Sequence, residues 1–111
     1  MRITKELVAA SSVPLVLAIL SDGESYGYEI IRRVRALSAG EMQWSDGMLY
    51  PVLHWLEAND YVEAHWQIAE SGRKRRYYAL KPEGVKFLKE QKEQWNTVSD
   101  TLRRAWRRQH A

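Results

Sequence analysis

The chain has 111 residues, of which 45% are hydrophobic and 28% charged, as is usual for one globular domain with a core of modest size. It contains no cysteine, which excludes disulfides, thiolate metal sites and cysteine nucleophiles and fits a cytoplasmic location. Residues 1–60 carry five Lys and Arg against eight Asp and Glu, but residues 61–111 carry twelve against six, so the basic second half indicates an anionic partner.

The N-terminal segment is predicted to be helical. Residues 3–10 suit a short helix, and a second helix is predicted to follow it, with Ser11 or Ser12 as its cap and Pro14 in its first turn. The dense apolar run at residues 13–20 predicts burial. It is too short to span a bilayer, so no membrane partner is expected.

The next predicted helix starts with Ser25 as its N-cap and ends near Gly40. Its apolar stripe at helical spacing comprises Tyr26, Ile30, Val34 and Leu37. Tyr28 lies on the opposite face. Residues 41–44 are then predicted as a very short strand.

The stretch "WSDGMLYPVLHWLE", residues 44–57, predicts a helix over about 46–58 with Ser45 as its N-cap. Its core stripe comprises Leu49, Val52, Leu53 and Leu56. Because Pro51 would remove one helical hydrogen bond, we expect this helix to be bent or loosened near its start. The face opposite the core carries Gly47, Tyr50, Pro51, His54 and Ala58.

Two alternating segments predict a two-stranded β-hairpin. In residues 62–68 apolar and polar side chains alternate, which is typical of a half-buried strand. Residues 75–80 alternate in the same way, and the loop with Gly72 joins the two strands. The cations near the hairpin tip are Arg73, Lys74, Arg75 and Arg76.

The last predicted helix begins at Pro82, since proline is favoured at the first helical position, and runs to about Arg108. Apolar side chains recur seven residues apart along this helix, as in a coiled-coil seam. They are Leu88, Trp95 and Leu102, with Val98 in the same seam. We expect the seam to pack on the first helices, on another subunit, or on both.

The predicted fold is mainly α with a small β-hairpin, in the order of a winged helix-turn-helix. In such folds the third helix enters the DNA major groove and the wing contacts the backbone or the minor groove. Tyr50 and His54 can donate hydrogen bonds to phosphates or base edges, and Ser45 lies at the positive end of the helix dipole. Cations on the wing suit phosphate neutralisation, although charge also protects a hairpin edge from aggregation.

Three ordered motifs resemble the PadR family of bacterial transcriptional regulators. They are SYGYEIIRRV at residues 25–34, WSDGMLYPVLHWLEANDYV at 44–62 and ESGRKRRYYALKPEG at 70–84, and the likeness covers most of residues 11–84. One departure is the pair Asn59 and Asp60, which replaces the glycine that the family usually has after the recognition helix, but asparagine can adopt the same left-handed backbone.

This resemblance implies a homodimeric repressor that binds double-stranded DNA, with residues 1–81 as the winged helix-turn-helix domain and residues 82–111 as a C-terminal dimerisation helix. The family's contacts to bases and phosphates map onto Tyr28, Ser45, Met48, Tyr50, His54, Arg73, Lys74 and Arg75. The single C-terminal helix resembles a subgroup whose dimer interface can admit a small aromatic or phenolic effector. The corresponding interface residues are Leu88, Trp95, Val98 and Leu102. Trp95 would stack on such a ligand or simply pack in the seam.

Other functions find less support in the residues. The histidines His54, His65 and His110 share no metal-ligand spacing, and no phosphate-binding loop or nucleophile motif occurs, so neither a cofactor nor an enzymatic activity is expected. The alternative function is a winged-helix protein-interaction module, which would lack the steep salt dependence of DNA binding. RNA binding would need an exposed aromatic platform on a sheet, which the pattern does not indicate.

Overall fold

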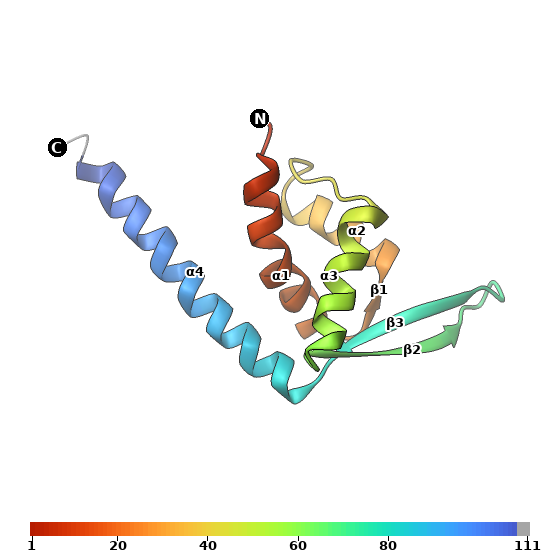
Figure 1. The fold of residues 1–111 in the computed structure, drawn as a ribbon. Helices are drawn as coiled ribbons and strands as arrows, with labels where there is room; N and C mark the ends of the chain where they lie inside the picture. The colour runs from red at the N-terminus through yellow and green to blue at the C-terminus, as the bar shows by residue number, and fades with distance from the viewer. Residues whose placement is uncertain (109–111) are drawn as a thin grey trace.

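The computed structural model of the protein describes residues 1–108. Its elements follow one another as four helices and three strands, with the wing on one side of the helices and the last helix on the other (Figure 1). They are α1 Lys5–Ser21, β1 Ser25–Tyr26, α2 Gly27–Leu37, α3 Asp46–Ala58, β2 Val62–Ile68, β3 Lys74–Leu80 and α4 Pro82–Arg108. No helix among these residues is both long and apolar enough to cross a membrane.

The N-terminal segment forms one helix, α1, and the prediction of two was wrong. Thr4 is the N-cap, and its hydroxyl accepts a hydrogen bond of 3.3 Å from the Leu7 amide. Pro14 therefore lies inside the helix. The Ser12 hydroxyl donates to the Ala9 carbonyl at 2.7 Å instead of capping a new helix. Burial of the following apolar turns in the core outweighs the interruption by proline.

The sheet has three strands in the order β1-β3-β2, one more than predicted. Ser25 is not the N-cap of α2 but part of β1, where it pairs with Tyr78, and its hydroxyl donates to the Glu29 carboxylate at 2.9 Å. The N-cap position belongs to Tyr26. The strand predicted at residues 41–44 does not form.

The third helix has the predicted bounds, but the left-handed backbone that follows it belongs to Asp60, with φ 61°, and not to Asn59, with φ −96°. α3 is continuous through Pro51, and Leu49, Leu53 and Leu56 are fully buried against α1 and α2. Ser45 occupies the N-cap position with extended backbone, but its side chain makes no capping hydrogen bond. The core stripe therefore fixes which face of α3 is turned outward.

The hairpin of β2 and β3 is buried only at its base, where Val62 pairs with Leu80 and Tyr78 fills the core. Farther out, Trp66 and Ile68 are exposed, so the prediction of a strand half-buried along its whole length was wrong. The apolar alternation is real, but the hairpin projects beyond the body of the protein, so the apolar side chains of its outer part have no core to enter (Figure 1).

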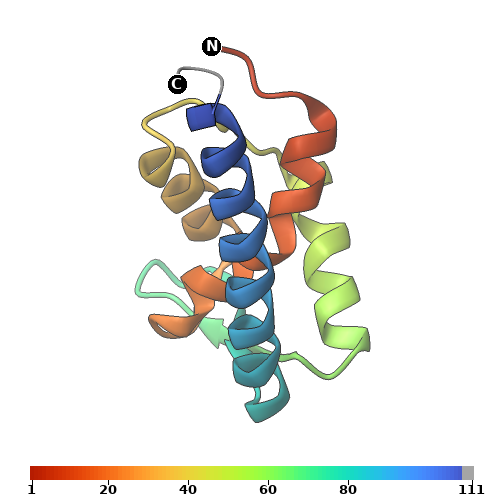
Figure 2. The ribbon, with the colours of Figure 1, turned by 90° about the vertical axis from the view of Figure 1, so that its left-hand side faces the viewer.

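The long helix α4 is anchored at its N-terminal end. Leu88 is buried in the core, and the Phe87 ring stacks on Tyr61 with centroids 4.2 Å apart. Beyond this anchor α4 rises away from α1 (Figure 1), and the view turned by 90° in Figure 2 shows α4 in front of the other helices. Val98 and Leu102 are exposed on the free part, so the seam is covered only at its start by its own chain.

Candidate nucleic-acid interface

A hollow of about 680 Å³ lies between the start of α2, the outward face of α3 and the wing. Its lining combines aromatic rings, hydrogen-bonding groups and a cluster of cations. The residues are Tyr26, Gly27, Tyr28, Asp46, Tyr50, His54, Trp66, Arg73, Lys74, Arg75, Arg76 and Tyr78. Asp46 is the only acidic residue in this lining, so the hollow is strongly basic. Such a surface suits a polyanion.

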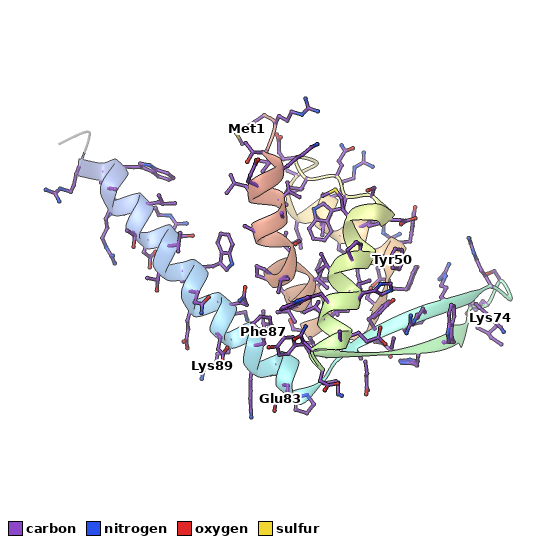
Figure 3. All side chains as sticks on the ribbon, in the orientation of Figure 1. Met1, Tyr50, Lys74, Glu83, Phe87 and Lys89 are labelled. Atoms are coloured by element: carbon purple, nitrogen blue, oxygen red, sulfur yellow. The ribbon has the colours of Figure 1, made fainter. Side chains whose placement is uncertain are left out.

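Tyr50 is held on the α3 wall of the hollow by a close approach of two helices. Gly27, the first residue of α2, lies so near that a Cβ atom there would stand 2.6 Å from the Tyr50 hydroxyl oxygen. Only a glycine leaves room for Tyr50 in this position. Figure 3 shows Tyr50 on the side of α3 that faces the wing, with Lys74 far out on the hairpin.

The four wing cations differ in how free they are. Arg76 donates to the Glu57 carboxylate at 3.0 Å and lies over the Tyr78 ring, so part of its charge is already neutralised. Arg75 lies over the Tyr26 ring, 4.4 Å from its centroid. Arg73 and Lys74 have no ion-pair partner within residues 1–108. These two are the cations most available to an external anion.

Side-chain contacts tie the wing to the segment around β1. Glu24, in the loop before β1, contacts His65 at 3.1 Å and accepts from the Gln67 amide at 2.8 Å. The Tyr26 and Tyr77 rings meet edge to face with centroids 5.3 Å apart, next to the β1–β3 pairing. These contacts join the wing to the segment that leads into α2.

The packing next to the hollow changes the pKa of one ionisable group, the Tyr78 hydroxyl. Burial raises the pKa of its hydroxyl above the usual value of 10.0, and the neighbouring Arg76 opposes that rise only in part. The hydroxyl therefore stays neutral at any pH near 7. Tyr78 therefore adds no negative charge to the hollow.

Six of the eight predicted contact residues line this hollow together. They are Tyr28, Tyr50, His54, Arg73, Lys74 and Arg75. Tyr28 is largely exposed and lies near Arg32. Ser45 and Met48 are not among the lining residues. Met48 instead lines a second cavity beside α1, because it is turned to the other flank of α3.

Trp66 is a lining residue that the sequence prediction missed. Its place in the alternating pattern assigned it to the buried side of β2, yet it is 66% exposed and faces the hollow opposite Arg76 in the strand register. The position of Trp66 far along the strand could have indicated that its side chain is exposed. Only the first residues of β2 reach the core, so an apolar side chain near the tip has no core to enter.

Metal ligation has no support within residues 1–108, where no three His, Cys, Asp or Glu side chains converge. His54 and His65 lie on different elements, in α3 and β2, and His110 lies outside the described residues. The hollow itself presents cations, hydroxyls and aromatic rings.

The segment that forms this hollow matches a known protein family. Residues 16–90, more than half of the chain, match the Transcriptional regulator PadR-like family. The chain belongs to this family. Its membership confirms the regulator predicted from the motifs, and places it among DNA-binding transcription factors, not enzymes.

Solved structures agree with the PadR-like assignment. A transcriptional regulator from Clostridium thermocellum superposes with a TM-score of 0.82 at 27% identity, over 92% of this chain and 96% of that one. A PadR-like transcriptional regulator from Bacillus cereus strain ATCC 14579 gives 0.76 at 28% identity, over 88% and 93% of the two chains. The mainly helical winged-helix fold with a long C-terminal helix is thus confirmed.

A curated relative is larger than this chain. The transcriptional regulator YqjI of Escherichia coli strain K12 is 30% identical over 89 residues, which are 80% of this chain but 41% of that protein. The PadR-like part is shared, and the present chain spans less than half the length of that relative.

Proposed function

We propose that the protein is a homodimeric repressor that reads a palindromic operator in the bacterial cytoplasm through α3 and the wing. The observation that carries the proposal is that the outward residues of α3 and the free wing cations line one basic hollow. The domain from residue 1 to 81 would bind DNA, and the helix from residue 82 to 111 would join two chains.

In this arrangement α3 enters the major groove and the wing follows the adjacent backbone. Tyr50 and His54 donate to phosphate oxygens or base edges, and Arg73 and Lys74 neutralise phosphates. Tyr28 supports the backbone contact from α2. Ser45 would take part through the backbone N–H groups at the helix start, where the dipole favours a phosphate.

The dimer is supported by the free part of α4. Val98, Leu102 and Trp106 are exposed there, and a row of large apolar side chains along one helix is unfavourable in water. Pairing of this row with a second copy would remove it from solvent. A two-fold axis would then place two α3 helices on half-sites about one helical turn of DNA apart, roughly 10 base pairs, or a multiple of that distance.

The most detailed part of the proposal is an aromatic effector that binds at the dimer interface. Trp95 is half-buried on α4 between the anchor at Leu88 and the exposed Val98, and its ring could stack on a flat ligand between the subunits. Leu88 itself is buried in the core of its own chain, so its part is to hold α4 in place. Trp95→Ala should abolish a response to such a ligand and spare operator binding.

Salt-dependent DNA binding tests the wing. Operator DNA, recovered by selection of bound genomic fragments, would be titrated by fluorescence anisotropy at several salt concentrations. Arg73→Ala with Lys74→Ala should weaken binding to all sequences and reduce the slope of log K against log salt by about 2. The matched control is Lys89→Ala with Lys92→Ala on exposed α4, which removes the same charge far from the hollow.

Two results would refute parts of the proposal. Equal losses in the wing pair and the α4 pair would mean that only net charge matters and that the wing makes no contact. A molar mass of one chain at micromolar concentration, measured by light scattering, would exclude the dimer. Leu102→Glu should by contrast convert a wild-type dimer into monomers, since it places a charge in the apolar row.

A further inference from the structure

A second cavity lies on the opposite flank of α3 from the basic hollow. It has a volume of about 820 Å³, is open to solvent on one side, and is lined by the N-terminal residues, the first turns of α1, the loop before α3 and the start of α3. Ligand sites of small molecules have volumes of about 300–1,000 Å³. The cavity is formed within one chain and does not involve the α4 seam.

Trp44 supplies an unused hydrogen-bond donor in the wall of this cavity. The side chain is 6% exposed, and its indole Nε1–H has no partner within residues 1–108. It is the only buried side-chain nitrogen or oxygen of the described residues without one. A buried donor that lacks an acceptor is unfavourable, so a ligand acceptor that reached it would relieve that penalty.

Methionine gathers at the same cavity. The chain has three methionines, and all of them, Met1, Met42 and Met48, line it. Methionine side chains are flexible and polarisable, and they are common on surfaces that adapt to apolar ligands. Their movement can open the way to Trp44, whose N–H is closed to water in the present arrangement.

The charges around the cavity favour an anion. Arg2 and Lys5 line it and have no ion-pair partner within residues 1–108, whereas the Glu41 carboxylate is already paired with the α-amino group of Met1 at 3.3 Å. The free charge is therefore positive. The cavity therefore has an apolar lining, one unpaired donor and a positive rim. A ligand with an apolar body and a carboxylate group would complement all three.

We propose that this cavity binds a small amphiphilic carboxylate, whose apolar body packs on the methionines and whose carboxylate accepts a hydrogen bond from Trp44 Nε1–H. The site is distinct from the effector site proposed at Trp95 in the dimer seam. Met48 and Pro51 of α3 form one wall, so an occupant contacts the helix whose other flank carries Tyr50. If α3 reads DNA as proposed above, the occupant would regulate that binding.

Octanoate is a suitable probe, and the indole signals of ¹⁵N-labelled full-length protein are a direct readout. The chain has five tryptophans, and Trp44→Phe and Trp95→Phe assign the two that matter. Octanoate should move the Trp44 indole signal downfield, as a new hydrogen bond requires, and leave the Trp95 signal in place. Octanamide, which has the same chain without the charge, should bind more weakly.

Trp44→Phe should lower octanoate affinity about tenfold or more, because it removes the donor and keeps an apolar ring. Arg2→Glu with Lys5→Glu, at two exposed positions that do not affect the core, should weaken octanoate and leave octanamide unchanged.

Several outcomes would overturn the site. Movement of the Trp95 signal alone would assign the ligand to the seam. An unmoved Trp44 signal, unaltered affinity in Trp44→Phe, or equal binding of octanoate and octanamide would each exclude the proposed recognition. Operator titration with and without octanoate is a separate arm. Absence of any DNA binding there would refute the proposed function, while the indole shift would still establish the site.

Discussion

The contact between Gly27 and Tyr50 gives a sharp test of how the outward face of α3 is built. A Cβ atom at position 27 would lie 2.6 Å from the Tyr50 hydroxyl oxygen, whereas ordinary contacts begin at 3.4 Å. In Gly27→Ala the hydroxyl must therefore retreat by about 0.8 Å. A hydrogen bond between oxygens has a range of only about 0.5 Å, so the hydroxyl would lose a DNA partner.

The size of the effect follows from that lost bond. A hydrogen bond to a charged group contributes about 1.5–3 kcal/mol, which is a tenfold or greater loss of operator affinity. Folding stability should change by less than about 1 kcal/mol, because Tyr50 is a flexible, partly exposed side chain and alanine favours the helix more than glycine does.

A double-mutant cycle separates this mechanism from a general disturbance of α2. Tyr50→Phe alone should reduce affinity by a similar factor, since it deletes the same hydroxyl. In the Gly27→Ala background Tyr50→Phe should then add little, and anisotropy titrations of the four proteins at one salt concentration measure the coupling. Strictly additive losses, or wild-type affinity in Gly27→Ala, would refute the reasoning.

Three further predictions address stability and charge. Gly84→Ala should destabilise the fold by about 1–3 kcal/mol or more in urea denaturation, because its Cβ would overlap the Tyr61 carbonyl oxygen, which cannot move aside; an unchanged midpoint would contradict this packing. Glu57→Gln should tighten operator binding at low salt, since it removes an acid and frees Arg76, and weaker binding would count against a DNA-facing Arg76. Pro51→Ala should raise the melting temperature followed by circular dichroism, by restoring a helical hydrogen bond, and should change operator affinity little, because Pro51 lines the cavity beside α1 and not the basic hollow; a large loss of operator affinity would contradict this placement.

Periodicity predicted the long elements because each buries a continuous apolar stripe. α3 and α4 were located to within a residue or so from that signal alone. β1 has two residues and takes its stability from pairing with Tyr77 and Tyr78, far along the chain, so it leaves no local pattern. The break predicted near Pro14 failed because burial of the surrounding helix overrides the local preference of proline.

Helix and strand periodicity was sufficient to predict part of the candidate site. Tyr50 and His54 were found because they lie opposite the core stripe, and the wing cations because they cluster at a turn. Trp66 was missed because the alternation of apolar and polar residues indicates the face of the strand on which a side chain lies. It does not indicate how far along the strand the core extends. Trp44 carried no sequence signal at all, because an unpaired indole N–H arises only from three-dimensional packing.

The two flanks of α3 line different surfaces, and the glycine and the proline of this helix lie on the flank away from the basic hollow. Asp46, Tyr50 and His54 line the basic hollow, but Gly47 and Pro51 line the cavity beside α1. The residues that weaken the helix thus lie toward the proposed ligand and not toward the DNA. Because proline has no N–H to donate, the first turns of α3 are held by fewer hydrogen bonds than the rest. Since both proposed binding surfaces share these turns of α3, a ligand in the cavity would act on operator binding by shifting the start of this helix.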